Sequence, residues 1–290
     1  MNEIKNNQDF QLVECPRDAM QGWKNFIPTE EKIAYLNSLL RVGFHTIDFG
    51  SFVSPKAIPQ MADTAQVLAG LKLDGSASRL LAIVANVRGA QEAAGWDEIN
   101  YLGFPFSISP TFQQRNANST IEESVGRVEE IQELCGQKGK KLVVYLSMGF
   151  GNPYGDPYDA GILLQWADAM VQRGIRIISL ADTVGLATPE QIQSALTALI
   201  PQYPDTVIGV HLHSTPANWK AKLKAALDAG CRRVDGALKG IGGCPMAGNE
   251  LVGNMDTENI ISLLEEEGLV PSLDREALRE SAALAGRIFI

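Results

Sequence analysis

Residues 175–191 read IRIISLADTVGLATPEQ and contain the repeating unit from which the fold follows. Ile175–Ala181 is a short apolar run rich in β-branched residues, as expected for a strand buried in a parallel sheet. Thr188-Pro189-Glu190-Gln191 predicts the start of a helix. Threonine can cap the helix, proline suits the first helical position because no amide hydrogen bond is needed there, and glutamine can reach back to the capping residue. Asp182-Thr183 lies between them. The stretch therefore predicts a strand, a polar turn and a helix.

The same alternation repeats along the chain. Thr120-Ile121-Glu122-Glu123 fits a capping box, and Gly43, Gly230 and Gly268 follow helical segments where a left-handed residue ends a helix. Phe104–Ser119 shows no regular period and is predicted to be irregular. The predicted strands are Phe10–Glu14, Thr46–Phe49, Leu80–Ala85, Tyr101–Ser107, Lys141–Ser147, Ile175–Ala181, Val207–Leu212 and Arg233–Ala237.

Repeated strand–helix units imply parallel strands, which leaves a closed barrel or an open doubly wound sheet. Eight units, with no GxGxxG sequence opening a helix, favour the closed form. We therefore predict an α/β fold, a (β/α)8 TIM barrel. No linker rich in Gly, Pro or Ser divides the chain. Residues 10–290 are thus expected to form a single domain with a short helical C-terminal tail, and residues 1–9 an N-terminal extension.

The composition excludes several classes of protein. Hydrophobic residues make up 45% of the 290 residues and charged residues 20%, which is typical of a soluble globular domain. The net charge of −9 argues against a nucleic-acid partner, because such proteins need a basic surface to displace counterions from phosphates. Met1–Phe10 lacks a hydrophobic targeting core, and no apolar run approaches the ~20 residues of a membrane span. The four cysteines are scattered without a CxxC pair, which is typical of a reduced protein of the cytoplasm.

Polar residues follow the predicted strands at their carboxyl ends, where the active sites of parallel barrels are built. Six of the eight strands lead into charged or polar side chains, so we expect these side chains to surround one site. They are Arg17-Asp18, Asp48, Ser51, Asn86, Arg88, Ser147, Asp182-Thr183, His211 and His213. The eighth strand runs into the glycine-rich segment Gly240–Pro245.

His211-Leu212-His213 is the sharpest local signal. Side chains two residues apart on a strand share a face, so both imidazoles can reach one ion while Leu212 points the other way. The alternative is a pair of barrel-lining histidines held by hydrogen bonds. The third histidine, His45, precedes the second strand and is expected to be structural or to face solvent.

The other polar candidates carry alternatives of their own. Arg17 can hold a carbonyl or enolate oxygen while Asp18 binds a metal, or the two form a surface ion pair. Cys244 can donate a proton from a loop that glycines allow to close, or it is an inert thiol. Asp182 can be a base or the partner of a metal ligand, or it caps the following helix.

Several of these stretches occur together in one known family. They are Pro16-Arg17-Asp18, Ser51–Lys56 (SFVSPK), Asp182-Thr183, His211-Leu212-His213, Gly242–Pro245 (GGCP) and Gly253-Asn254. In order and approximate spacing, from about Phe10 to Gly268, the sequence resembles the 3-hydroxy-3-methylglutaryl-CoA (HMG-CoA) lyases. These enzymes belong to a superfamily of metal-dependent lyases and synthases on TIM barrels. The SFVSPK and GGCP stretches separate this family from the synthases.

The resemblance implies a retro-Claisen cleavage of a 3-hydroxyacyl-CoA substrate to acetyl-CoA and a keto acid, acetoacetate for HMG-CoA, and also a homodimer. A divalent metal, Mg²⁺ or Mn²⁺ with Zn²⁺ left open, would help to lower the pKa of the substrate hydroxyl. The residues and roles carried over are Asp18, His211, His213 and Asn254 as metal ligands, His211 or Asp182 as the base, Arg17 for the enolate, Cys244 as proton donor, Gln21 and Asp48 as support, and Lys24 near the mouth for CoA.

Some positions depart from the family pattern. Ala19 and Ala181 stand where glycine is common, Asp48 where glutamate is usual, Ser214 in place of an aspartate, and Met246 where tyrosine is frequent. The metal ligands survive, so these changes bear on the acyl group that is accepted. Two other functions therefore stay open: a related lyase or aldolase with a different hydroxy acid, and a non-catalytic barrel that binds metal or acyl-CoA.

Overall fold

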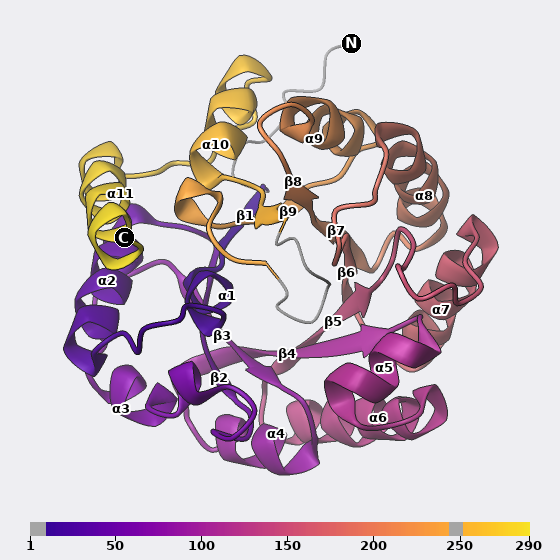
Figure 1. Ribbon diagram of the computed structural model, residues 1–290, viewed down its shortest axis with the longest axis horizontal. Helices are drawn as coiled ribbons and strands as arrows, with labels where there is room; N and C mark the ends of the chain where they lie inside the picture. Colours follow the sequence, from indigo (N-terminus) through magenta and orange to yellow (C-terminus); the bar gives the residue numbers. More distant parts are fainter. Residues whose placement is uncertain (1–9, 244–251) are drawn as a thin grey trace.

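Eight parallel strands close into a barrel in the computed structural model, which describes residues 10–243 and 252–290. All the predicted strands are confirmed, and neighbours in sequence are neighbours in the barrel, with β9 pairing back onto β1. Figure 1 shows the strands inside a ring of helices. The strands are β1 (Gln11–Glu14), β2 (Thr46–Phe52), β3 (Arg79–Val84), β4 (Ile99–Ser107), β5 (Lys141–Ser147), β6 (Ile177–Ala181), β7 (Val207–His211) and β9 (Arg233–Gly236). The predicted extension, residues 1–9, lies outside the described residues.

The helices begin and end largely where the sequence indicated. Thr120 and Thr188 both form capping boxes, and Gly43 adopts a left-handed conformation (φ 88°) at the end of its helix. The α-helices are α1 (Pro16–Gln21), α2 (Thr29–Val42), α3 (Thr64–Ala69), α4 (Val87–Ala94), α5 (Pro110–Ala117), α6 (Ile121–Gln137), α7 (Ala160–Gln172), α8 (Pro189–Gln202), α9 (Trp219–Asp228), α10 (Thr257–Glu266) and α11 (Arg275–Ile288). Among the described residues, no helix is long and apolar enough to cross a lipid bilayer.

The prediction that Phe104–Ser119 is irregular was wrong. β4 ends at Ser107, as the strand prediction had it, but α5 (Pro110–Ala117) occupies most of the remaining stretch. Ser109 caps α5 by accepting a hydrogen bond from the amide of Phe112, and Pro110 occupies the first turn. The helix was missed because its body is mostly polar, so no apolar period marks it; its Ser-Pro start was the available signal.

Two further short strands lie beside the barrel. β8 (His213–Ser214) pairs antiparallel with β10 (Gly253–Asn254), and the register sets His213 opposite Asn254. The amide of Met255 also donates to the carbonyl of Leu212 at 3.0 Å. This pairing fixes two predicted metal ligands, distant in sequence, side by side.

The predicted helical tail belongs to the outer layer of the barrel. α11 packs against α2, where the buried hydroxyl of Ser281 donates to that of Ser38 at 2.9 Å. Arg41 of α2 also forms an ion pair with Glu280 of α11. The carboxyl-terminal helix thus covers the first long helix of the barrel.

Glu14, the last residue of β1, is fully buried. Its carboxyl group accepts hydrogen bonds from the hydroxyl of Thr257 (2.5 Å) and the amide of Leu238 (2.8 Å), so it ties β1 to α10 and to the turn after β9. Burial raises the pKa of Glu14 to about 8, although these two hydrogen bonds act in the opposite direction.

This pKa predicts a stability that depends on pH. The folded state holds the proton of Glu14 more tightly than the unfolded state, so its contribution is complete below about pH 4.5 and is lost as pH rises to about 8. Glu14→Gln keeps an oxygen that accepts from Leu238 and carries no charge, and its NH2 group can donate to the Thr257 hydroxyl, which then acts as the acceptor. We expect the Tm of the wild type to fall relative to that of Glu14→Gln across this window in thermal melts. Parallel Tm curves for the two proteins would contradict this role of Glu14.

Candidate active site

A cavity of about 290 Å³ opens at the carboxyl ends of the strands. Its apolar lining includes Val53, Ile58, Ile83, Pro105, Phe112 and Tyr145. Its polar lining comes from the strand ends and from α1, and consists mainly of Arg17, Asp18, Gln21, Asp48, Ser147, Thr183, His211 and His213. The structure therefore brings most of the predicted site residues together around one cavity.

α1 presents three of these residues. Because Asp18 and Gln21 are three apart and Arg17 and Gln21 four apart, the three side chains share one helix face. Gln21 donates its amide to Asp18 Oδ1 at 2.6 Å and accepts from Arg17 Nη1 at 2.8 Å. Arg17 Nη1 also lies 3.1 Å from Asp18 Oδ1. Gln21 thus holds the carboxylate and the guanidinium in fixed positions.

Arg17 also pairs with Asp48 at the middle of β2. Its Nε lies 3.0 Å and its Nη2 2.5 Å from Asp48 Oδ2. Although aspartate is shorter than glutamate, Asp48 reaches the guanidinium directly. Burial raises the pKa of Asp48 to about 6 in spite of Arg17. Burial alone would lower the pKa of Arg17, but the charges of Asp48 and Asp18 outweigh it and raise that pKa.

Asp18 and the two imidazoles converge. One potential ligand atom from each of Asp18, His211 and His213 lies within 4.8 Å of the others. Burial would raise the pKa of Asp18, but Arg17 and both histidines lower it below its ordinary value, so this group is a carboxylate at neutral pH. Burial, with the charge of His211, lowers the pKa of His213 to about 4, so its ring is neutral. Both are in the protonation state that a metal requires.

Asn254 completes this group. Its Nδ2 donates to Asp18 Oδ2 at 2.7 Å and to the carbonyl of Ile241 at 2.9 Å. Its Oδ1 is buried without a hydrogen-bond partner among residues 10–243 and 252–290. Gly242 (φ 101°) permits the close approach, because a Cβ there would lie 2.6 Å from Asn254 Nδ2. An unsatisfied buried oxygen beside a carboxylate and two imidazoles fits a divalent cation.

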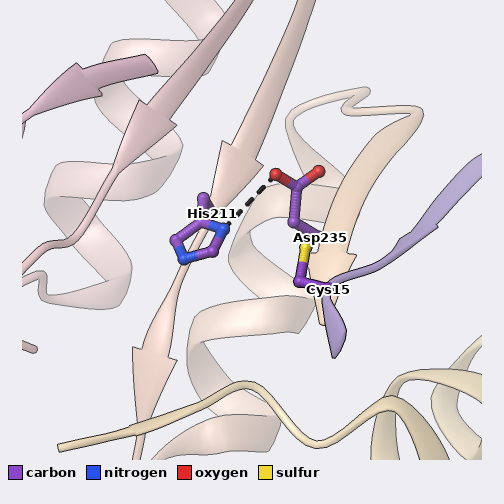
Figure 2. A group of neighbouring side chains, drawn as sticks. All are labelled: Cys15, His211 and Asp235. Carbon is purple, nitrogen blue, oxygen red and sulfur yellow. Dashed lines mark hydrogen bonds and ion pairs between the residues drawn. The ribbon is translucent and has the colours of Figure 1, made fainter. Parts of the chain in front are cut away.

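One ring nitrogen of His211, Nδ1, contacts a carboxylate deeper in the barrel. This Nδ1 lies 3.3 Å from Oδ2 of the fully buried Asp235, as the dashed line in Figure 2 shows. Burial alone would lower the pKa of His211, but the hydrogen bond and charge of Asp235 raise it. The second nitrogen points away from Asp235 in Figure 2 and is the one free to bind a metal.

Several predicted residues do not line the cavity. Ser51, Asn86 and Arg88 lie outside the lining, and Asn86 instead caps α4 by accepting a hydrogen bond from the amide of Gly89. Asn254 also lies outside the lining, although it donates to Asp18.

Asp182 is buried outside the lining of the cavity, where Oδ1 accepts from the amide of Ala187 (2.9 Å) and Oδ2 forms an ion pair with Lys222 (2.7 Å). Lys24 lies exposed in the bend after α1 and does not line the cavity. Cys244, with the rest of the GGCP stretch and Met246, lies outside the described residues.

Two residues of the site were missed from the sequence. Asp235 holds His211, and Lys222 donates both to Asp182 and to the carbonyl of His213 at 2.9 Å. Asp235 could have been found from the period of two along β9, which sets it on the inner face of the barrel. Lys222 gives no such signal, because a lysine in α9 is expected to face solvent.

Comparisons with known proteins agree with this geometry. A family model described as HMGL-like matches residues 10–285. The cytoplasmic 3-hydroxy-3-methylglutaryl-CoA lyase of Rattus norvegicus is 34% identical over 268 residues, covering 92% of this chain and 77% of that protein. The hydroxymethylglutaryl-CoA lyase of Bacillus subtilis is 33% identical over 267 residues, covering 92% and 88%.

Solved structures give the same result. The HMG-CoA lyase of Bacillus subtilis superposes with a TM-score of 0.89 at 31% identity, covering 97% of this chain and 94% of that one. An HMG-CoA lyase of Acinetobacter baumannii, solved with coenzyme A and 3-methylmalate, gives 0.88 at 30% identity, covering 99% and 93%. The predicted resemblance is confirmed over nearly the whole barrel, and the chain belongs to the HMGL-like family.

Proposed function

We propose that this protein is a divalent-metal-dependent lyase that cleaves HMG-CoA to acetyl-CoA and acetoacetate. The observation that carries the proposal is the convergence of Asp18, His211 and His213 beside Arg17 in one cavity, with Asp18 hydrogen-bonded to Asn254, whose own Oδ1 is buried and unsatisfied among residues 10–243 and 252–290. The relatives that match nearly the whole chain are named for this reaction.

The four converging residues would hold the cation. This set has two oxygen and two imidazole donors, which suit Mn²⁺ or Mg²⁺. It lacks the sulfur donors that are typical of structural zinc sites. When bound, such an ion supplies a Lewis acid that lowers the pKa of the substrate's 3-hydroxyl group. Asn254 would serve this set in two ways, because its amide group donates to Asp18 and its buried, unsatisfied oxygen would bind the cation.

Arg17 is placed to stabilise the enolate that forms when the carbon–carbon bond breaks. It lines the cavity next to Asp18, and Asp48 holds its Nε and Nη2 edge from behind. A guanidinium fixed in this way needs little reorganisation as negative charge develops on the thioester oxygen. Asp48 is shorter than the glutamate usual in the family, but it still contacts Arg17 directly. This departure from the family therefore gives no reason to expect a different substrate.

Two residues were predicted as the base that accepts the hydroxyl proton, and their positions differ. His211 lines the cavity, but Asp235 occupies its Nδ1, so only Nε2 can face the substrate or the metal, and this nitrogen cannot accept a proton while it binds a metal. Both carboxylate oxygens of Asp182 are engaged by Ala187 and Lys222. This geometry favours His211 for contact with substrate and Asp182 for holding the end of β7. Cys244 as the proton donor to the enolate carbon stays a prediction.

The acyl group would lie against the apolar side chains that line the cavity, and the CoA portion of the substrate would extend out through the mouth. The Acinetobacter baumannii enzyme binds coenzyme A and a small branched hydroxy acid. A branched methyl-bearing acyl chain is compatible with a lining that includes Val53, Ile58 and Ile83. We propose that exposed Lys24 lies near the phosphates of CoA.

The proposal is tested with metal-stripped protein and a panel of 3-hydroxyacyl-CoA thioesters, with and without Mg²⁺ or Mn²⁺. We expect HMG-CoA to give equal amounts of acetyl-CoA and acetoacetate, and only when metal is present. Cleavage of another thioester with no acetoacetate from HMG-CoA would reject this substrate and keep the lyase. No cleavage of any thioester would reject catalysis and favour a barrel that only binds metal or acyl-CoA.

His213→Ala tests the metal ligands, with His45→Ala as the matched control. We expect His213→Ala to lose Mn²⁺ affinity by at least about 10- to 100-fold in titration calorimetry, since even the loss of an outer partner of a ligand has that effect. His45 bonds to Thr46 at the amino end of β2, away from the cavity, so its replacement should leave Mn²⁺ affinity unchanged. Equal affinity in His213→Ala and wild type would show that the ligand set is wrong.

Arg17→Gln tests the stabilisation of the enolate. Glutamine keeps a donor but lacks the charge, and removal of one such stabilising group typically costs about 2.7–4 kcal/mol, a loss of about 10²–10³ in kcat. Because Arg17 is not one of the proposed ligands, Mn²⁺ should still bind by calorimetry. A variant with near-normal kcat would leave Arg17 with a purely structural role.

A further inference from the structure

A buried arginine lies deeper in the barrel, below the proposed metal ligand His211. Arg233, in β9, is 1% exposed, and its Nε and Nη2 have no hydrogen-bond partner among residues 10–243 and 252–290. In that part of the chain, the one carboxylate within ion-pair distance is Asp235, whose Oδ1 lies 3.9 Å from Arg233 Nη2. An isolated buried charge is costly, so this pair requires a reason.

The neighbouring strand makes room for this arginine. A Cβ at Gly209 of β7 would lie 2.8 Å from Arg233 Cγ and 2.9 Å from both Cβ and Cδ. The stem of Arg233 therefore lies against the bare backbone of β7, two residues before His211. No larger residue fits at position 209 unless Arg233 moves.

Asp235 stands between the arginine and the histidine. The register of β7 and β9 pairs His211 with Asp235, and Figure 2 shows the carboxylate turned toward the ring. Its two oxygens face different partners: Oδ2 lies 3.3 Å from His211 Nδ1, and Oδ1 faces Arg233. Neither Arg233 nor Asp235 lines the cavity, so both would act on the site through His211.

We propose that Arg233 and Asp235 are positioning residues that fix which ring nitrogen of His211 carries the proton. A carboxylate only accepts hydrogen bonds, so Asp235 holds the proton on Nδ1 and leaves the lone pair of Nε2 directed at the metal group. Arg233 orients Asp235 by attracting its Oδ1, which leaves Oδ2 turned toward His211. This inference rests on the proposed metal-dependent function.

The Asp235→Asn variant separates this role from simple packing. In Asp235→Asn, Arg233 attracts the amide oxygen, so the NH2 group turns toward His211 and donates to Nδ1. The ring must then carry its proton on Nε2, where it blocks the metal. In the double variant Arg233→Met/Asp235→Asn, nothing holds the amide oxygen, which can turn to His211 and restore the original tautomer.

The experiment measures the tautomer directly. The protein has three histidines, so ¹⁵N-histidine labelling and long-range ¹⁵N–¹H spectra of the metal-free protein, recorded at alkaline pH, give one pattern for each ring. We expect the Nδ1–H form of His211 in the wild type, the Nε2–H form in Asp235→Asn, and the Nδ1–H form again in the double variant. His45 is the internal control and should not change.

Mn²⁺ affinity gives the second readout. Asp235→Asn should weaken binding by about 10- to 100-fold, and the double variant should recover much of that loss. Leu199→Ala, a truncation in the buried face of α8, controls for destabilisation and should keep wild-type affinity.

An unchanged tautomer and unchanged affinity in Asp235→Asn would overturn the inference while the metal site stands. If the double variant showed the same His211 tautomer and the same Mn²⁺ affinity as Asp235→Asn, Arg233 would have no part in setting the tautomer. If the wild type bound no metal, the proposed function would fail, and the spectra would still decide whether Asp235 sets the tautomer.

Discussion

The site depends on how its surroundings stabilise the negative charge of one buried carboxylate, that of Asp18. Asp18 is only 7% exposed, and a charge at that depth is stable only where cations and hydrogen-bond donors surround it. Arg17 and Gln21 from its own helix hold one oxygen, and the amide of Asn254 holds the other. His211 lies on the side that remains. These contacts lower the pKa of Asp18 and orient it toward the two imidazoles before any ligand arrives.

Closure of the barrel brings together the groups that stabilise this charge. Because β9 pairs with both β1 and β7, the helix after the first strand comes to lie beside the histidines of the seventh. The β8–β10 ribbon then sets Asn254 against His213. The chain is a carbon–carbon lyase of the HMGL-like family, and its cavity is lined by both charged and apolar side chains. The layer below, with Asp235 and Arg233, extends the polar network into the barrel core.

The sequence predicted the barrel because each strand and most helix ends carry local signals, such as the capping boxes at Thr120 and Thr188. It also predicted most of the polar residues of the cavity. The carboxyl ends of parallel strands meet at one end of the barrel, and two histidines two residues apart share one face, so both features can be read from the sequence. It did not predict that Asp182 would be engaged by Lys222, since that pair joins a strand end to a helix far along the chain. The role of Asp235 was missed for a similar reason: only strand register sets it beside His211.

The central claim is that Asp18, His211, His213 and Asn254 form one metal centre. The most direct measurement is an anomalous difference map at the manganese absorption edge, from crystals of the protein grown or soaked with Mn²⁺. The account predicts a single strong peak in contact with Asp18, both histidines and the side-chain oxygen of Asn254, while Asp235 stays hydrogen-bonded to the opposite side of the His211 ring. A peak that touches only surface carboxylates, or none near Asp18 at saturating Mn²⁺, would contradict it.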